Sequence, residues 1–168
     1  MKKLGDYEAL DKPDMRSLFT SYFNALDIPV IDYLAIGIQN NINKTSSSLM
    51  SNYEWQETFR ARELAQHDPI RRTAFNTHCK IFSFDEIDYY DTNGKEVMKQ
   101  REKHFIENGL VIMDRTLGYN FILTLATGYK NFRAYPFYFE NIAAINQIFL
   151  DLKQIITPST EKYQVKIY

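Results

Sequence analysis

Apolar side chains recur at intervals of three and four residues near both ends of the chain, the pattern of one buried face of a helix. Asp11 and Pro13 precede the first stripe at positions suited to a helix start, and the pattern predicts an amphipathic helix that ends at about Asp27. A second stripe predicts a long helix that stops at Thr157-Pro158. Its members are Phe139, Ile142, Ile145, Ile148, Phe149, Leu152 and Ile156.

Shorter helices are predicted in the middle of the chain. Residues 55–66 have a helical pattern, and a second short helix should begin at Asp68, whose carboxylate caps it while Pro69 occupies the first turn. A further helix is predicted over 96–109, with Gly109 as its C-cap.

Strands are predicted where apolar, β-branched and aromatic residues gather between turn signals. These segments are 30–38, 79–84 and the two stretches on either side of Leu117-Gly118. The polar segments 40–48 and 91–96 are predicted to be a surface loop and a turn.

The last predicted strand, residues 119–128, is apolar on both faces. Phe121, Leu123 and Leu125 alternate with Ile122, Thr124 and Ala126. An antiparallel sheet usually leaves one face in water, so two apolar faces require cover on both sides. We therefore predict an α/β/α sandwich, a three-layer fold with a small, mostly antiparallel central sheet. A length of 168 residues fits one domain, assigned to 1–157, followed by 158–168 as a C-terminal tail or truncated linker.

Composition and charge exclude several classes of function. Twenty Lys and Arg balance 21 Asp and Glu, and no segment gathers the positive charge that nucleic-acid binding requires. The aromatic content of 15% is high enough to wall an apolar pocket. The N-terminus has no signal-peptide core, no apolar run is long enough to span a membrane, and the single Cys79 agrees with a reducing cytosol. A cytoplasmic protein without membrane contact is expected.

The sequence carries no positive indication of catalysis. His67, His78 and His104 are not spaced as metal ligands, and one cysteine cannot complete a zinc site with them. His78 and Cys79 are adjacent in the sequence, and because neighbours on a strand point to opposite faces they do not form a nucleophile and base pair. Phosphate-binding glycine loops and the nucleophile elbow are also missing. We expect no enzyme activity, no metal and no cofactor.

Trp55 and Asp68 admit two interpretations. Taken singly, the chain's only tryptophan is most simply a core residue, and an aspartate before a proline is most simply a helix N-cap. Alternatively, both side chains face one cavity and hold the same small molecule.

The segment NYEWQETFRARELAQHDPI, residues 52–70, resembles the autoinducer-binding domain of LuxR-type quorum-sensing transcription regulators. The resemblance rests on Trp55, Phe59 and Asp68-Pro69, and continues through the KIFSF, FIENGL and LTLAT segments to cover residues 13–157. The family fold is an α/β/α sandwich, as predicted above. The family's ligand, an N-acyl homoserine lactone, lies between the sheet and one helix layer.

The resemblance implies three hydrogen-bonding roles. The Trp55 indole N–H would donate to the lactone carbonyl, and Asp68 would accept from the ligand's amide N–H. Thr124, on a strand where the family often has Ser or Thr, would bond an acyl-chain carbonyl. These roles agree with elementary chemistry, because a buried indole N–H needs an acceptor and a buried carboxylate needs a donor.

Other positions depart from the family pattern. Phe59 and Phe84 stand where the family usually has Tyr and Trp, so we expect them to pack against a ligand. Tyr53 is a further candidate for ligand binding, although it lies two residues before the tryptophan, whereas the family's tyrosine lies four before it, at Ser51 here. Met113 is expected to crowd the pocket.

Two functions remain open. The chain is either a signal receptor domain that couples a lactone or related amphiphile to dimerisation, or a ligand-independent interaction module that modulates a full-length regulator. Residues 158–168 are too few for a helix-turn-helix domain, so we expect no DNA contact by this chain itself. The expected partners are a small-molecule signal and either a second copy of the chain or a full-length regulator. A receptor should have an open cavity beside Trp55 and Asp68, whereas a closed module should have Asp68 bonded by backbone N–H groups only.

Overall fold

The computed structural model describes residue 10 and residues 12–42, 44–116 and 118–164. Its centre is a five-stranded sheet in the order β2-β1-β5-β4-β3, in which every neighbouring pair is antiparallel. The strands are β1 (Tyr33–Asn40), β2 (Ser46–Met50), β3 (Ile81–Ser83), β4 (Asn108–Arg115) and β5 (Tyr119–Thr127).

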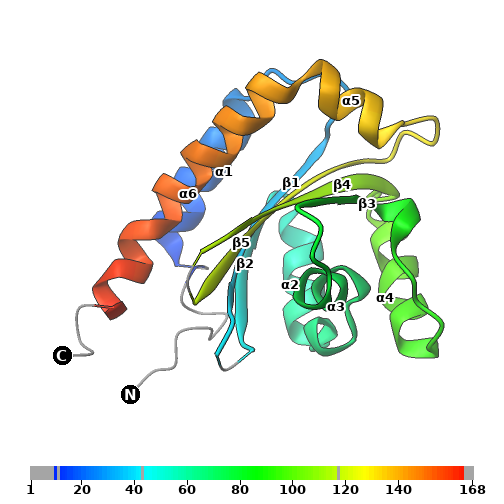
Figure 1. Cartoon of the computed structure of the whole chain (residues 1–168), viewed down its shortest axis with the longest axis horizontal. Helices are drawn as coiled ribbons and strands as arrows, with labels where there is room; N and C mark the ends of the chain where they lie inside the picture. Colours follow the sequence, from blue (N-terminus) through cyan, green and yellow to red (C-terminus); the bar gives the residue numbers. More distant parts are fainter. Residues whose placement is uncertain (1–9, 11, 43, 117, 165–168) are drawn as a thin grey trace.

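Helices cover both faces of the sheet (Figure 1). The first layer, called here the α1–α6 layer, consists of α1 (Pro13–Ala25), α5 (Ala134–Glu140) and α6 (Ile142–Gln164). The second, called the α2–α4 layer, consists of α2 (Tyr53–Ala61), the 3-10 helix η2 (Leu64–His67), α3 (Pro69–Asn76) and α4 (Thr92–Lys103). A second 3-10 helix, η3 (Phe84–Glu86), follows β3. The predicted three-layer sandwich is therefore confirmed.

The alternation along β5 divides the core in two. Leu123 and Leu125 are fully buried in an apolar cluster under the α1–α6 layer. Ile122 and Ala126 pack instead into the cluster under the α2–α4 layer, which also contains Trp55. Both faces of this central strand are covered, as its composition predicted.

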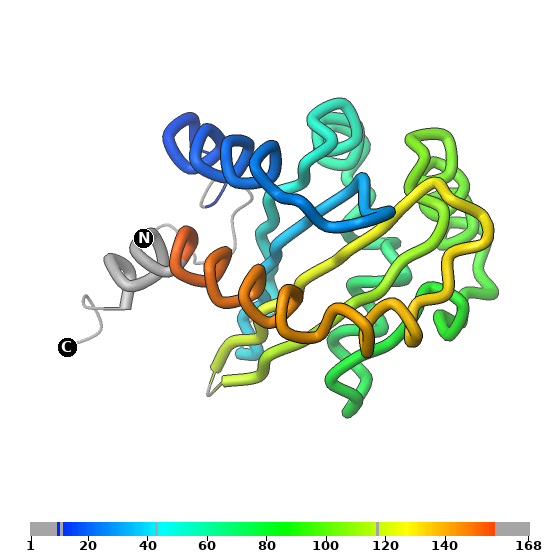
Figure 2. Tube along the Cα trace, turned by 90° about the horizontal axis from the view of Figure 1, so that it is seen from above, coloured from blue at the N-terminus to red at the C-terminus, as the bar shows by residue number. Residues whose placement is uncertain are grey.

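Helices α1 and α6, from opposite ends of the chain, lie side by side (Figure 2). The Tyr22 hydroxyl on α1 donates to Asp151 Oδ2 on α6 at 2.7 Å. Phe19 of α1 and Leu152 of α6 are fully buried in the same cluster. This layer is thus held by close apolar packing with polar contacts at its margin.

The predicted loop at 40–48 is partly wrong, because β2 begins at Ser46. Its backbone pairs with β1, with Ser46 opposite Gln39 and Met50 opposite Ala35. Serines give no apolar alternation, yet at the edge of a sheet the backbone hydrogen bonds to one neighbour are enough to form a strand. This strand becomes one wall of the candidate site.

The predicted turn at 91–96 and helix at 96–109 are also corrected. Helix α4 begins at Thr92, because the Asp91 side chain caps it by accepting from the Gly94 N–H at 3.0 Å, and it ends at Lys103. Gly109 is not a C-cap but a residue of β4. A Cβ there would lie 2.8 Å from both the Leu125 carbonyl oxygen and Phe84 Cζ, so the glycine allows Phe84 to pack on the strand.

The remaining helix and turn predictions are largely confirmed. Asp68 caps α3, and Gly118 adopts a φ of +91° between β4 and β5, while Leu117 lies outside the described residues. The predicted C-terminal helix is divided at Asn141 into α5 and α6, and α6 continues past Thr157-Pro158 to Gln164. A proline removes one helical hydrogen bond but its φ angle is compatible with a helix.

Candidate ligand-binding site

A cavity lies between the sheet and the α2–α4 layer, at the end of the sheet formed by β2, β1 and β5. Its volume is about 80 Å³. Met50, Phe59, Ile70 and Ile122 supply apolar lining. Ser46, Asp68, Arg71, Arg101 and Thr124 supply polar lining. The cavity therefore combines an apolar surface with several groups that can form hydrogen bonds or ion pairs.

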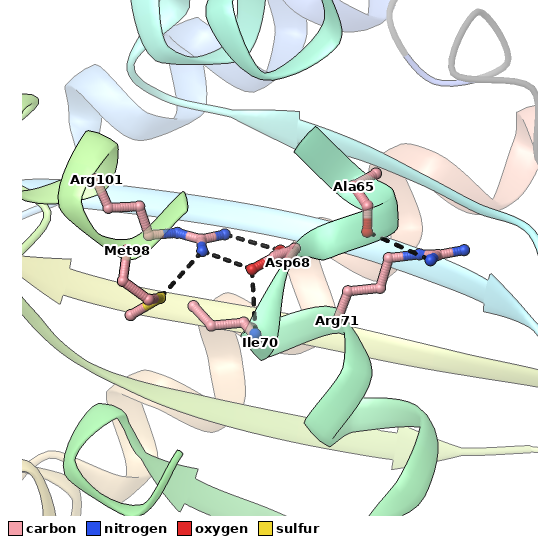
Figure 3. Close-up of polar contacts among 6 residues, drawn as sticks. All are labelled: Ala65, Asp68, Ile70, Arg71, Met98 and Arg101. Atoms are coloured by element: carbon pink, nitrogen blue, oxygen red, sulfur yellow. Dashed lines mark hydrogen bonds and ion pairs between the residues drawn. The ribbon is translucent and has the colours of Figure 1, made fainter. Parts of the chain in front are cut away.

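Asp68 and Arg101 form a buried, two-pronged ion pair in the wall of the cavity (Figure 3). Arg101 Nη1 donates to Asp68 Oδ1 at 2.6 Å, and Nη2 donates to Oδ2 at 2.9 Å. Their side chains are only 5% and 6% exposed. Burial by itself lowers the pKa of Arg101, but the charge and hydrogen bonds of Asp68 outweigh it and hold the pKa above its usual value.

This pair uses most of the accepting capacity of Asp68. Oδ1 also accepts from the Ile70 N–H at 3.1 Å, which is the helix cap predicted from the sequence. A carboxylate offers about four lone-pair sites. Three of the acceptor sites are occupied by the protein's own donors. The partners of Asp68 differ from those expected of a closed module, because a buried side chain holds the carboxylate together with a backbone N–H.

Trp55 lies beside the cavity without lining it. Its indole ring packs against Phe59 at 5.5 Å and His104 at 5.3 Å between ring centroids, and Arg101 Cζ lies 5.4 Å from the indole centroid. Trp55 is fully buried, and within the described residues its Nε1–H has no hydrogen-bond acceptor. An unpartnered buried donor is unusual and indicates either a cost to the fold or a place for a ligand oxygen.

The phenol of Tyr33, on β1, interacts electrostatically with Asp68, Arg101 and Trp55. Its pKa is raised chiefly by burial and secondarily by Asp68, while the Arg101 charge and the Trp55 N–H oppose the rise. The indole is thus close enough to influence the Tyr33 oxygen, but the two form no hydrogen bond of normal geometry. Among the described residues, the indole N–H is therefore without a hydrogen-bond partner.

The structure brings together only some of the residues predicted from the sequence. Asp68, Phe59 and Thr124 line one cavity, and Trp55 packs against Phe59. Tyr53 is not part of this group: it is 59% exposed on α2, with the Arg16 guanidinium 4.6 Å from its ring centroid.

Phe84 is also separated from the cavity. It is buried against Gly109 and lines a different hollow of about 350 Å³, together with Asp85, Glu102 and Glu107. That hollow is larger but predominantly polar, so it suits an acyl chain poorly. Met113 is buried in the core beneath the α2–α4 layer and lines neither space.

Arg101 is the important residue that the sequence interpretation missed. A signal for it existed: Val97, Met98 and Arg101 form one buried face of α4, and a cation four residues after an apolar residue lies on the same side of a helix. A buried arginine requires a partner. The partner, Asp68, lies 33 residues away in the sequence, so local spacing could not identify it.

Arg71, on α3, was likewise not recognised. Its Nε–H donates to Ser46 Oγ and its Nη2 to the Lys44 carbonyl oxygen, both at 2.8 Å. Its Nη1 reaches the Ala65 carbonyl oxygen at 3.4 Å (Figure 3). These contacts fasten α3 to the start of β2 and place a guanidinium at the edge of the cavity.

No three His, Cys, Asp or Glu side chains gather as a metal ion would require in the ranges that the structure describes. Within those ranges, no helix is both long and apolar enough to cross a membrane.

The chain belongs to the autoinducer binding domain family, whose family model matches residues 13–127. This membership confirms the resemblance to LuxR-type regulators noted in the sequence. The family is one of receptor domains, not of enzymes, and the chain is accordingly a signal receptor domain. No curated protein matches the chain.

Solved structures with the same fold have very different sequences. One is CepR2 from Burkholderia cenocepacia, titled an N-acylhomoserine lactone dependent LuxR family transcription factor: TM-score 0.59, 11% identity, covering 87% of this chain and 84% of that one. Another is the VqsR ligand-binding domain from Pseudomonas aeruginosa, with a TM-score of 0.58 and 16% identity. The match covers 89% of this chain and 90% of that one. A third is SdiA in complex with octanoyl-rac-glycerol, with a TM-score of 0.54 and 9% identity. The match covers 98% of this chain and 69% of that one. At these identities the likeness establishes the fold alone.

Proposed function

We propose that this receptor domain binds an N-acyl homoserine lactone or a related amphiphile in the cavity between the sheet and the α2–α4 layer, and couples binding to dimerisation. The observation that carries the proposal is the placement of Phe59, Asp68 and Thr124 around one cavity, with the unpartnered Trp55 indole N–H packed behind Phe59. Apolar lining would accept the acyl chain, at about 0.8 kcal/mol for each buried methylene.

The size of the cavity indicates how binding would be coupled to a change in the protein. Sites for drug-sized ligands usually measure about 300–1,000 Å³. The cavity here measures about 80 Å³, so an acyl chain would enter only if the α2–α4 layer moved away from the sheet. A ligand that favours the opened arrangement would shift the population toward it, which is the physical basis of a switch.

Thermal unfolding with a series of N-acyl homoserine lactones and acyl glycerols of increasing chain length tests the proposal. A ligand at one hundred times its dissociation constant should add about 2.7 kcal/mol of stability, a shift of several degrees for a chain of this size. The shift should depend on chain length.

Two variants test whether the ligand binds in this cavity. Thr124→Val removes a hydroxyl from the cavity with little change in volume, and Trp55→Phe removes the unpartnered N–H. Both should reduce the ligand-induced shift. Thr20→Val, at an exposed position of α1 on the opposite layer, is the matched control and should leave the shift unchanged. Equal shifts in all three variants would place the ligand elsewhere.

The second candidate is a ligand-independent interaction module that modulates a full-length regulator. The small cavity and the engagement of Asp68 by Arg101 favour it. The exposed apolar residues Ile142 and Leu150 on α6 offer a surface for association. Sedimentation with and without ligand separates the candidates: a receptor should change its dimer fraction on binding, whereas a module should associate to the same extent in both conditions.

A further inference from the structure

The head group that this cavity can recognise follows from the state of Asp68. A ligand amide N–H needs an acceptor, but both Asp68 oxygens already accept from Arg101 at 2.6 and 2.9 Å. Displacing Arg101 would leave a guanidinium buried to 95% without its carboxylate, and breaking a buried pair in this way is strongly destabilising. Without displacing Arg101, a ligand amide would have only the one remaining lone-pair site of a carboxylate that Arg101 already neutralises.

The remaining charge of the cavity is positive. Its charged lining consists of Asp68, Arg101 and Arg71, and the first two neutralise each other. Arg71 contacts only uncharged acceptors, namely one hydroxyl and two backbone carbonyl oxygens. In the part of the chain that the structure describes, no carboxylate pairs with it.

A second cation, Lys44, lies close to Arg71 and adds to the positive charge beside the cavity. Arg71 Cζ lies 5.0 Å and Lys44 Nζ lies 5.4 Å from the centroid of the Phe75 ring. The two cations thus share one aromatic ring beside the start of β2. Two neighbouring positive charges near an apolar cavity attract an anion more strongly than either would alone.

A hydroxyl group completes the head-group environment. Ser46 Oγ accepts from Arg71 Nε, so its own O–H is free to donate in another direction. Thr124 lines the same cavity further along the sheet, level with Ala35 and Met50, and is therefore not part of the head-group environment. A carboxylate is the anion that matches Arg71 and Ser46, because its two oxygens can accept from an arginine and from a hydroxyl.

On this basis, and within the proposed receptor function, we infer that the signal is an acyl chain ending in a carboxylate, and that Arg71 binds its head group. Arg101 acts as a specificity-determining residue by neutralising Asp68 and occupying both of its oxygens, which weakens the anchor that a ligand amide would use. The apolar lining around Phe59 and Ile70 receives the chain.

Three probes with the same eight-carbon acyl group test this inference by calorimetry or thermal unfolding. They are octanoate, N-octanoyl homoserine with the lactone ring opened, and intact N-octanoyl homoserine lactone. The first two carry a carboxylate, and the second and third share the amide. The two anions should bind at least about tenfold more tightly than the lactone, and added salt should weaken them.

Variants of adjacent residues identify the head-group site. Arg71→Gln should weaken octanoate about tenfold and leave the lactone unchanged, while Arg71→Lys, which keeps the charge without the fork, should give an intermediate loss. Arg72→Gln is the matched control, because Arg72 is exposed and paired with Asp91 outside the cavity lining. It removes the same charge and should leave octanoate affinity unchanged.

The outcomes separate the inference from the proposed function. If the intact lactone binds more tightly than both anions, or if Arg71→Gln and Arg72→Gln weaken octanoate equally, the head-group inference is wrong and the receptor function stands. If none of the three probes nor any longer acyl homologue binds, both are wrong and the interaction-module candidate remains.

Discussion

The two helix layers bury the same sheet by different physical means. Under the α1–α6 layer, residues such as Leu34, Leu123 and Leu125 are fully buried in a continuous apolar cluster. Under the α2–α4 layer, the apolar cluster adjoins a buried ion pair and a cavity. Close-packed apolar contacts stabilise a fold, whereas a buried ion pair contributes little net stability after its desolvation cost. The α1–α6 layer therefore contributes mainly to stability, and the proposed ligand site lies under the α2–α4 layer.

The largest expected effect comes from breaking the ion pair. Arg101→Met leaves Asp68 buried without its partner and should lower the free energy of unfolding by about 3–5 kcal/mol, measured by urea denaturation. The double variant Asp68→Asn with Arg101→Met should recover much of this loss, because no charge is then left buried alone. A double variant as unstable as the single one would show that shape, not charge, decides the effect.

A pair of truncations on β5 compares the layers directly. Leu125→Ala opens a hole in the closed core of the α1–α6 layer and should cost about 2–5 kcal/mol. Ile122→Ala removes a half-buried side chain that already borders the cavity, so its cost should be smaller. The same denaturation experiment measures both. Equal losses in the free energy of unfolding would contradict the view that β5 is closely packed on the α1–α6 side and borders a cavity on the α2–α4 side.

Gly109→Ala tests the packing at the far edge of the α2–α4 layer. The added methyl group would lie 2.8 Å from Phe84 Cζ and from the Leu125 carbonyl oxygen, so Phe84 or the strand must shift. We expect a loss of about 1–3 kcal/mol from overpacking. Adding Phe84→Leu should relieve part of it, since the ring that the methyl group meets is then gone. A Gly109→Ala variant as stable as the parent would contradict the close approach.

The smallest expected effect concerns pH. Burial raises the pKa of Tyr33 in the folded state above its ordinary value, while in the unfolded chain tyrosine ionises near pH 10. The unfolded state then binds fewer protons than the folded state above about pH 10, so stability should fall as the pH rises. Tyr33→Phe should flatten this decline relative to the parent protein, as measured by denaturation between pH 8 and pH 11. An unchanged slope would contradict the assignment.

Local patterns in the sequence were sufficient for much of the fold. The apolar stripes predicted α1 and the C-terminal helical region, and the Asp68-Pro69 step predicted the start of α3. The two apolar faces of residues 119–128 predicted helices on both sides of the sheet, which Figure 1 shows. These features depend on residues close together in the chain, so spacing alone reveals them.

Other features required the assembled molecule. The serines of β2 form a strand only because β1 lies beside them, and Gly109 is a strand residue because Phe84 occupies the space where a Cβ would be. Neither contact leaves a local pattern. The sequence consequently predicted a loop and a helix cap at these positions.

For the site, the sequence by itself determined the protein family and three of the residues around the cavity, Phe59, Asp68 and Thr124. It did not determine what Asp68 binds. Only the tertiary structure decided that, by bringing Arg101 from α4 to within 2.6 Å of the carboxylate across 33 residues of chain. The physical reason is that a cap depends on neighbours in sequence, whereas the pairing of a buried charge depends on whichever group the packing of helices places next to it.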